Sequence, residues 1–182
     1  MKIVLSHLPS PLGAMRLATD AQGGVRALSF ADRRRRLHDH LQAQYGGGLA
    51  LSEGPPPAAM ADALQRYFDG ALDGLDGIAT AAAGTELEQR VWAALRRIPA
   101  GQTMTYGALG RSLGLTDWRA ALDVGAAVGA NPIAILVPCH RVLGANGDLK
   151  GFAWGLQRKR WLLEHEAAID ARAAVPQTAA LF

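Results

Sequence analysis

The chain has 182 residues, a length that allows one ample domain or two small ones and excludes a large multidomain protein. Hydrophobic residues make up 49% of the chain and charged residues 19%, a balance that excludes a disordered protein. The formal net charge is +3, and residues 1–84 carry 8 basic and 8 acidic side chains whereas residues 85–182 carry 11 and 8. A surface that binds a polyanion is therefore expected first in the second half.

Cys139 is the single cysteine of the chain, which excludes an internal disulfide framework and a zinc site built on several thiolates. The apolar start is too short for a signal peptide, and no apolar run approaches 18 residues. We expect a cytoplasmic protein without a membrane segment.

Short apolar runs separated by turn residues predict a small antiparallel meander over residues 2–31. A helix is expected over 31–45, ended by three glycines and followed by a loop up to Pro57. The apolar positions of a second helix are Met60, Leu64, Tyr67 and Phe68. Residues 70–84 are rich in Gly, Ala and Asp, and we predict a linker and a domain boundary there.

The second half begins with a predicted helix that Thr85 caps and Pro99 ends. Two further helices are expected over 105–113 and 117–130, and the glycine-containing turn between them indicates a helix-turn-helix. The apolar run 133–137 predicts a buried strand, 145–148 a tight turn and 156–166 a last helix. The tail beyond residue 167 has little pattern.

Cys139 is the first candidate for chemistry. A free thiol is only about 3% ionised at pH 7, so a cysteine that attacks carbon needs a base or a positive charge beside it. His140 and Arg141 follow Cys139 directly, and Pro138 precedes it. The alternative is that Cys139 is an inert buried residue at a strand end.

Glu166 is the second candidate, because helical spacing places it on the apolar stripe of Leu162 and Leu163. A buried carboxylate needs a partner, and a histidine is a natural one, since the carboxylate fixes the tautomer of the ring. The alternative is that Glu166 frays into water at the helix end.

These residues lie within segments that resemble the O6-alkylguanine-DNA alkyltransferase family (methylated-DNA–protein-cysteine methyltransferase), bacterial type. The resemblance covers residues 85–166 and is carried by Arg90-Val91-Trp92, Ile98-Pro99-Ala100-Gly101, Thr105-Tyr106-Gly107, Asn131-Pro132, Pro138-Cys139-His140-Arg141-Val142, Gly151-Phe152-Ala153-Trp154-Gly155 and Trp161-Leu162-Leu163-Glu164-His165-Glu166. A weaker likeness, at Ser10-Pro11-Leu12-Gly13, extends to the ribonuclease-H-like N-terminal domain of that family.

The resemblance implies that Cys139 accepts an alkyl group from O6 of guanine, and by extension from O4 of thymine, in a direct displacement that consumes the protein. It implies that His140 deprotonates Cys139 through an ordered water and that Glu166 holds the imidazole. Asn131 would brace the turn that carries the cysteine, and Tyr106 would bind the extruded base and help to neutralise the departing guanine.

The resemblance also implies a pocket for a flipped base. The carbonyls of Val142 and Cys139 would accept from its exocyclic amine, the Ala153 backbone N–H would face O6, and Phe152 and Trp154 would complete the pocket, with Trp154 narrowing it toward methyl groups. No cofactor and no metal are implied, and no protein partner is required.

Double-stranded DNA that carries O6-alkylguanine is the implied partner, with contacts expected from Arg119, Ala120, Ala121, Leu122 and Arg141. The family usually has an arginine where this chain has Leu122, a residue that could instead act as an apolar wedge between base steps. The alternatives are that Arg119 supplies the charge, or that Leu122 packs in the core and the chain binds DNA poorly.

The predicted fold is α+β: a small ribonuclease-H-like α/β domain over 1–84, a mostly helical domain over 85–170 with a helix-turn-helix and the active-site cysteine, and a tail over 171–182. The predicted activity is a single-turnover alkyl transfer in DNA repair. A non-catalytic reader of alkylated DNA on the same fold and a cysteine–histidine hydrolase are the alternatives.

Other conspicuous residues receive plainer interpretations. Arg33–Arg36 is expected to be a solvated helix face, and His38 and His40 show no further pattern of metal ligands. The tryptophans Trp92, Trp118 and Trp161 are expected in the core.

Overall fold

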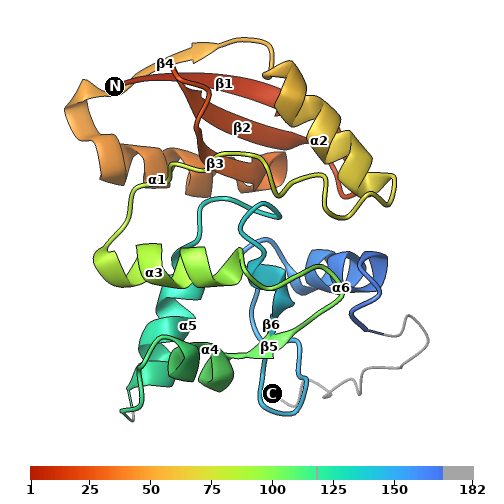
Figure 1. The fold of residues 1–182 in the computed structure, drawn as a ribbon. Helices are drawn as coiled ribbons and strands as arrows, with labels where there is room; N and C mark the ends of the chain where they lie inside the picture. The colour runs from red at the N-terminus through yellow and green to blue at the C-terminus, as the bar shows by residue number, and fades with distance from the viewer. Residues whose placement is uncertain (118, 170–182) are drawn as a thin grey trace, which may run out of the picture.

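The computed structural model describes residues 1–117 and 119–169, so the predictions for Trp118 and for the tail over 171–182 lie outside the described residues. The first part of the chain forms a four-stranded sheet in the order β3-β2-β1-β4 (Figure 1). Strands β1 (Lys2–Leu8), β2 (Met15–Asp20) and β3 (Val25–Phe30) make the predicted antiparallel meander.

Side-chain alternation gives the sheet two apolar faces. One face carries Ile3, Ala18 and Ala27, and it packs against Leu37 and Leu41 of helix α1 (Arg34–Tyr45). The other face carries Leu17, Leu28 and Phe30 among others and packs in one cluster with helix α2 (Ala58–Phe68) and with the core of the second part of the chain. The core of the second part is therefore continuous with one face of the sheet.

Strand β4 (Ala50–Glu53) lies where the sequence analysis expected a loop. It pairs in parallel with β1, from Lys2 beside Ala50 to Leu5 beside Glu53. All four of its residues are exposed, so the strand has no buried apolar pattern that the sequence could reveal. It can pair with β1 because α1 carries the chain back to that edge of the sheet.

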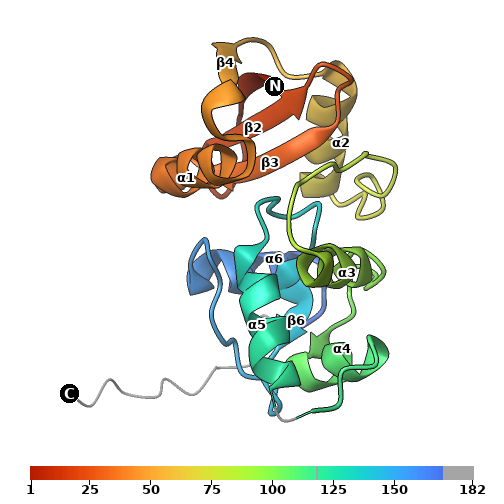
Figure 2. The ribbon, with the colours of Figure 1, turned by 90° about the vertical axis from the view of Figure 1, so that its left-hand side faces the viewer.

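The second part of the chain lies beneath the sheet in the views of Figures 1 and 2 and is mostly helical. Helix α3 (Glu86–Leu95) starts at the predicted cap, where Thr85 and Glu88 form a reciprocal capping box. Helices α4 (Tyr106–Ser112) and α5 (Ala120–Ala130) pack on each other, and α6 (Leu156–His165) ends one residue before Glu166. A short parallel pair, β5 (Met104–Thr105) and β6 (Val142–Leu143), completes this part.

The predicted strand over 133–137 is wrong, although the segment is buried throughout. Its backbone folds into a compact turn in which Ile135 has a φ of 67°, a conformation that strains a β-branched residue by about 1–3 kcal/mol. Two backbone hydrogen bonds join this loop to β3: Leu28 N–H donates to the Pro132 carbonyl, and Ala134 N–H donates to the Leu28 carbonyl. An uninterrupted apolar run indicates burial but cannot distinguish a strand from such a loop.

The architecture is mixed α+β, as predicted. Several long-range contacts join residues 1–68 to the second part of the chain, among them the docking of Pro132 and Ala134 on β3. The boundary at residue 84 stays a prediction. Within residues 1–117 and 119–169, no helix is long and apolar enough to cross a bilayer.

Candidate active site

Cys139 opens a single 3₁₀ turn (Cys139–Arg141) that follows Pro138. Only 4% of the residue is exposed. Burial raises the pKa of the thiol to about 11, although the neighbouring Asn131 amide and the positive charges of Lys159 and Arg36 lower it. At pH 7 the thiolate fraction is then roughly one part in ten thousand, so transfer of the thiol proton requires a base.

His140 is fully buried beside the thiol residue. Its Nε2 lies 2.9 Å from Oε1 of Glu166, and its Nδ1 has no hydrogen-bond partner among the described residues. Burial lowers the pKa of His140, and the contact with Glu166 partly offsets that effect. The ring is thus neutral at rest, with Nε2–H donating to the carboxylate and Nδ1 available as a proton acceptor.

Glu166 caps the end of α6 with its carboxylate turned inward, and the residue is 2% exposed. Besides His140, it accepts from Nε of Arg141 at Oε2 (2.8 Å) and from Nη2 of Arg141 at Oε1 (2.7 Å). Burial would raise the pKa of Glu166, but the hydrogen bonds from His140 and Arg141 hold it well below its ordinary value. The carboxylate is therefore charged, and the predicted contact between Glu166 and His140 is present.

Asn131 lies at the end of α5, fully buried, and ties together the loop that carries the thiol. Its side-chain amide donates to the carbonyls of Ile133 (3.2 Å) and Val137 (2.8 Å), while its side-chain oxygen accepts from Ile133 N–H (2.9 Å). This is the position expected of a residue that braces the cysteine turn.

The residues expected to contact a base surround the same centre. Tyr106 is the first residue of α4 and is half-buried. Its burial, and to a smaller extent the nearby Cys139, raise the pKa of its hydroxyl. Phe152 stands edge-on to His140 at 6.5 Å and to Trp154 at 5.2 Å between ring centroids, and Ala153, half-buried, lies between Phe152 and Trp154 in the chain. Trp154 is buried and donates from Nε1 to Ser29 Oγ at 3.0 Å, so β3 fixes its indole.

The two carbonyls predicted to bind an exocyclic amine already have one donor each. Val142 N–H donates to the Cys139 carbonyl, and Nζ of Lys159 donates to the Val142 carbonyl at 2.7 Å. Each oxygen keeps a second lone pair for a ligand. Lys159 is fully buried, and no sequence pattern indicates this, because lysine side chains usually reach solvent from a helix.

The residues predicted to contact DNA are not all on one surface. Ala121 and Leu122 are exposed on α5, Leu122 to 69%, and Arg119 is exposed at the cap of the same helix. The exposure of Leu122 contradicts the alternative that it packs in the core. Ala120 is 8% exposed, so its side chain offers no contact surface.

The prediction for Arg141 is wrong. The residue is 8% exposed, and its guanidinium binds the Glu166 carboxylate and, through Nη1, the Ile98 carbonyl. A buried carboxylate is stable only when it is paired with a cation. Arg141 pairs with Glu166 and therefore does not offer its charge to a DNA phosphate.

Two residues of the site come from the first part of the chain and were missed. Tyr67 of α2, predicted only as a core position, donates from its hydroxyl to Oε1 of Glu166 at 2.7 Å. Arg36 of α1 was expected on a solvated face, yet it is half-buried, binds the Gly129 and Asn131 carbonyls, and lies 5.5 Å from the Trp154 ring centroid. No local sequence pattern predicts either of these contacts.

Comparisons with known proteins agree on one family. The family described as "6-O-methylguanine DNA methyltransferase, DNA binding domain" matches residues 86–168. A protein of Salmonella typhimurium named "Methylated-DNA--protein-cysteine methyltransferase" is 43% identical over 167 residues, which are 91% of this chain and 96% of the relative. A protein of Mycobacterium tuberculosis with the same name is 48% identical over 115 residues, 62% of this chain and 68% of the relative.

A solved structure is similar over the same extent. The crystal structure of Mycobacterium tuberculosis OGT in complex with DNA superposes with a TM-score of 0.73 at 35% identity and covers 91% of this chain and 93% of the other. Sequence, fold and the geometry around the single cysteine point the same way, and the chain belongs to the methylated-DNA–protein-cysteine methyltransferase family.

Proposed function

We propose that this protein repairs DNA by transferring a methyl group from O6 of guanine, and from O4 of thymine, to Sγ of Cys139. The observation that carries the proposal is the buried thiol beside His140, whose ring is held by Glu166 through Nε2 while Nδ1 has no partner among the described residues. The names of relatives that match over most of the chain support it.

The proposed chemistry balances without a cofactor. Nδ1 of His140 accepts the thiol proton through an ordered water, and the Glu166 carboxylate stabilises the imidazolium that forms. Sγ then attacks the methyl carbon, and the bond to O6 breaks with its electron pair remaining on guanine, which is neutralised by the proton that left the thiol. Tyr106, at the start of α4, would donate a hydrogen bond to the departing base.

The product is a thioether, which lacks a good leaving group, so one protein molecule repairs one lesion. The raised pKa of Cys139 keeps the thiol protonated until the base acts. A thiol that stays unreactive until the base acts is suited to a protein that can react only once.

The proposed DNA surface is a helix-turn-helix formed by α4 and α5, on which Arg119, Ala121 and Leu122 are exposed. The target atom is stacked inside duplex DNA, so the nucleotide must be flipped into the pocket, at a cost of a few kcal/mol. Under this proposal Ala153 N–H faces O6, and Phe152 and Trp154 wall the pocket.

We further propose that residues 1–84 form a ribonuclease-H-like domain and residues 85–170 the alkyltransferase domain. The strand order β3-β2-β1-β4, with β4 parallel to β1, supports the first part of this proposal. A cytoplasmic location, with access to chromosomal DNA, follows from the proposed reaction.

Turnover separates this function from the two alternatives. The protein is incubated with a tenfold excess of duplex DNA containing O6-methylguanine, and both the intact protein mass and the repaired DNA are quantified. One methyl group per protein and one repaired lesion per protein support the transferase. Binding without an adduct would identify a reader, and repair beyond one lesion per protein would identify a hydrolase.

A further inference from the structure

We propose that Tyr67, supplied by α2 in the first part of the chain, is a positioning residue for methyl transfer that acts on His140 through Glu166. The proposal rests on the proposed function, in which His140 is the base. It extends the Cys139–His140–Glu166 relay by a fourth group from a distant element.

The geometry singles out one oxygen atom. The hydroxyl of Tyr67 lies 2.7 Å from Oε1 of Glu166, the same atom that lies 2.9 Å from Nε2 of His140. Nη2 of Arg141 also donates to Oε1, at 2.7 Å, whereas Oε2 accepts from Nε of Arg141. Tyr67 and His140 therefore share one carboxylate oxygen, and a change at one of them must alter the bond of the other.

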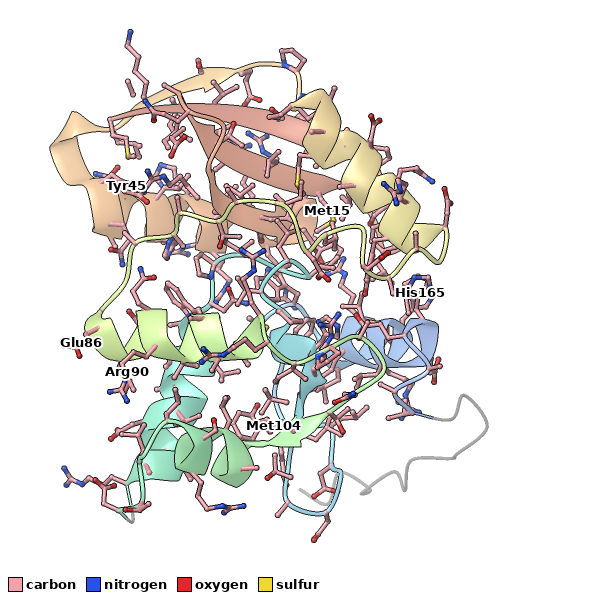
Figure 3. All side chains as sticks on the ribbon, viewed as in Figure 1. Met15, Tyr45, Glu86, Arg90, Met104 and His165 are labelled. Atoms are coloured by element: carbon pink, nitrogen blue, oxygen red, sulfur yellow. The ribbon has the colours of Figure 1, made fainter. Side chains whose placement is uncertain are left out.

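Ring packing and a backbone hydrogen bond hold Tyr67 in place. Tyr67 is fully buried, and its ring stands edge-on to those of Phe68 and His165, each at 5.3 Å between centroids. Nε2 of His165 donates to the Tyr67 carbonyl at 2.8 Å. Figure 3 shows His165 on α6 beside the end of α2, the place where the two helices meet.

Toward the ionised carboxylate of Glu166, the hydroxyl of Tyr67 acts as a donor. Burial, together with the charge of Glu166, raises the pKa of Tyr67 far above its ordinary value. The hydrogen bonds from His140 and Arg141 lower the pKa of Glu166 and keep its carboxylate ionised, so the hydroxyl of Tyr67 donates in this bond. Tyr67 thus contributes a permanent dipole directed at the counter-charge of the base.

The consequence for His140 has a definite sign. The charged or titratable groups that act on His140 are Glu166 at the end of α6, Lys159 on α6 and Arg141 on its own turn. Tyr67 withdraws part of the negative charge of Oε1, so removal of its hydroxyl leaves more of that charge for His140 and raises the pKa of the imidazole. It also leaves Arg141 as the only donor besides His140 that is described on this carboxylate, so the orientation of Glu166 is held less firmly and proton transfer slows.

The test is the pH dependence of single-turnover methyl transfer by full-length protein on duplex DNA containing O6-methylguanine. For Tyr67→Phe we expect the maximal rate to fall about 3–30-fold and the midpoint of the acidic limb to move to higher pH, with DNA affinity unchanged. Tyr45→Phe is the matched control, since it removes a hydroxyl from α1 that lies near Arg26, on the other side of the view in Figure 3 from His165. An unchanged rate and midpoint in Tyr67→Phe would overturn the proposal.

A double-mutant cycle separates positioning from packing. If Tyr67 acts through Glu166, Tyr67→Phe changes the rate of the Glu166→Gln variant less than twofold. The same loss in both backgrounds would mean that Tyr67 only supports the fold. Replacing Tyr67 with a fluorinated tyrosine strengthens the donor and retains the ring, so it should lower the pKa of His140 measured by NMR, and an unchanged value would contradict the proposal even if Tyr67→Phe fails to fold.

Failure of the proposed function looks different. If the wild-type protein transfers no methyl group, the function is refuted. The NMR titration of His140 still decides whether Tyr67 tunes it.

Discussion

At the scale of single residues, the charge of Glu166 matters most, because it determines how well His140 accepts a proton. The carboxylate partly offsets the lowering of the His140 pKa by burial. Glu166→Gln removes the charge and retains the shape, so the pKa of His140 should fall. We expect methyl transfer to slow by about 10–1,000-fold, or roughly 1.4–4 kcal/mol in barrier, with the acidic limb of the pH profile moving to lower pH.

The direction of that movement is opposite to the one expected for Tyr67→Phe. Single-turnover rates between pH 5 and 9 measure both, and DNA affinity should change little. Glu164→Gln on the same helix is the control, since Glu164 only approaches Arg160 at 3.9 Å and is half-buried. A Glu166→Gln variant with the wild-type pH profile would refute the relay.

At the scale of elements, α5 presents Leu122 to solvent and Val124 to the core. Flipping a base leaves a gap in the stack, and a leucine inserted there would remove apolar surface from water, worth up to about 1.5–3 kcal/mol. Leu122→Ala should therefore weaken repair of duplex DNA more than repair of a short single strand. Leu122→Arg should be tolerated.

Stability measurements supply the control for this prediction. Leu122→Ala should change the free energy of unfolding by less than about 0.5 kcal/mol, because the side chain is exposed. Val124→Ala should cost about 1–3 kcal/mol, because that residue is fully buried. If Leu122→Ala slows repair of duplex DNA and of single-stranded DNA equally, Leu122 does not act as a wedge.

Helix α6 stabilises the segment around residue 150 through Lys159. Its ammonium donates to the carbonyls of Val142, Lys150 and Gly151, and burial lowers its pKa to about 8, so it remains charged at pH 7. Lys159→Met should lower the free energy of unfolding by about 2–3 kcal/mol, since it leaves these carbonyls without their donor. Lys150→Met, at an exposed position, is the control, and an equal effect of both changes in urea unfolding would contradict this role.

At the scale of the whole molecule, the excess of positive charge over residues 85–182 predicts where DNA binds. The logarithm of affinity should fall with the logarithm of salt concentration by about 0.9 for each phosphate neutralised. Arg119→Gln should reduce that slope by about one phosphate. Charge-reversing changes of the exposed Arg33 to Arg35 should leave the slope unchanged, and a large loss there would place the DNA surface on α1.

The sequence predicted what depends on local pattern. Helix caps such as Thr85, the meander of the sheet and the inward position of Glu166 follow from spacing and residue type. The predictions from sequence were wrong where a contact between distant residues determines the structure. Tyr67 meets Glu166 across 99 residues, Arg141 turns inward because Glu166 needs a cation, and the loop over 133–137 bonds to β3 instead of forming a strand.

Methyl transfer converts the thiol of Cys139 into a thioether. The most direct test is peptide mapping by mass spectrometry after incubation with an equal amount of duplex DNA whose O6-methylguanine carries a ¹³C-labelled methyl group. We expect the labelled methyl group at Sγ of Cys139, on the peptide that contains this residue, and we expect Cys139→Ser to bind the DNA without acquiring a label. A labelled methyl group on any other residue, or labelled methanol released into solution with Cys139 unmodified, would show that Cys139 is not the acceptor.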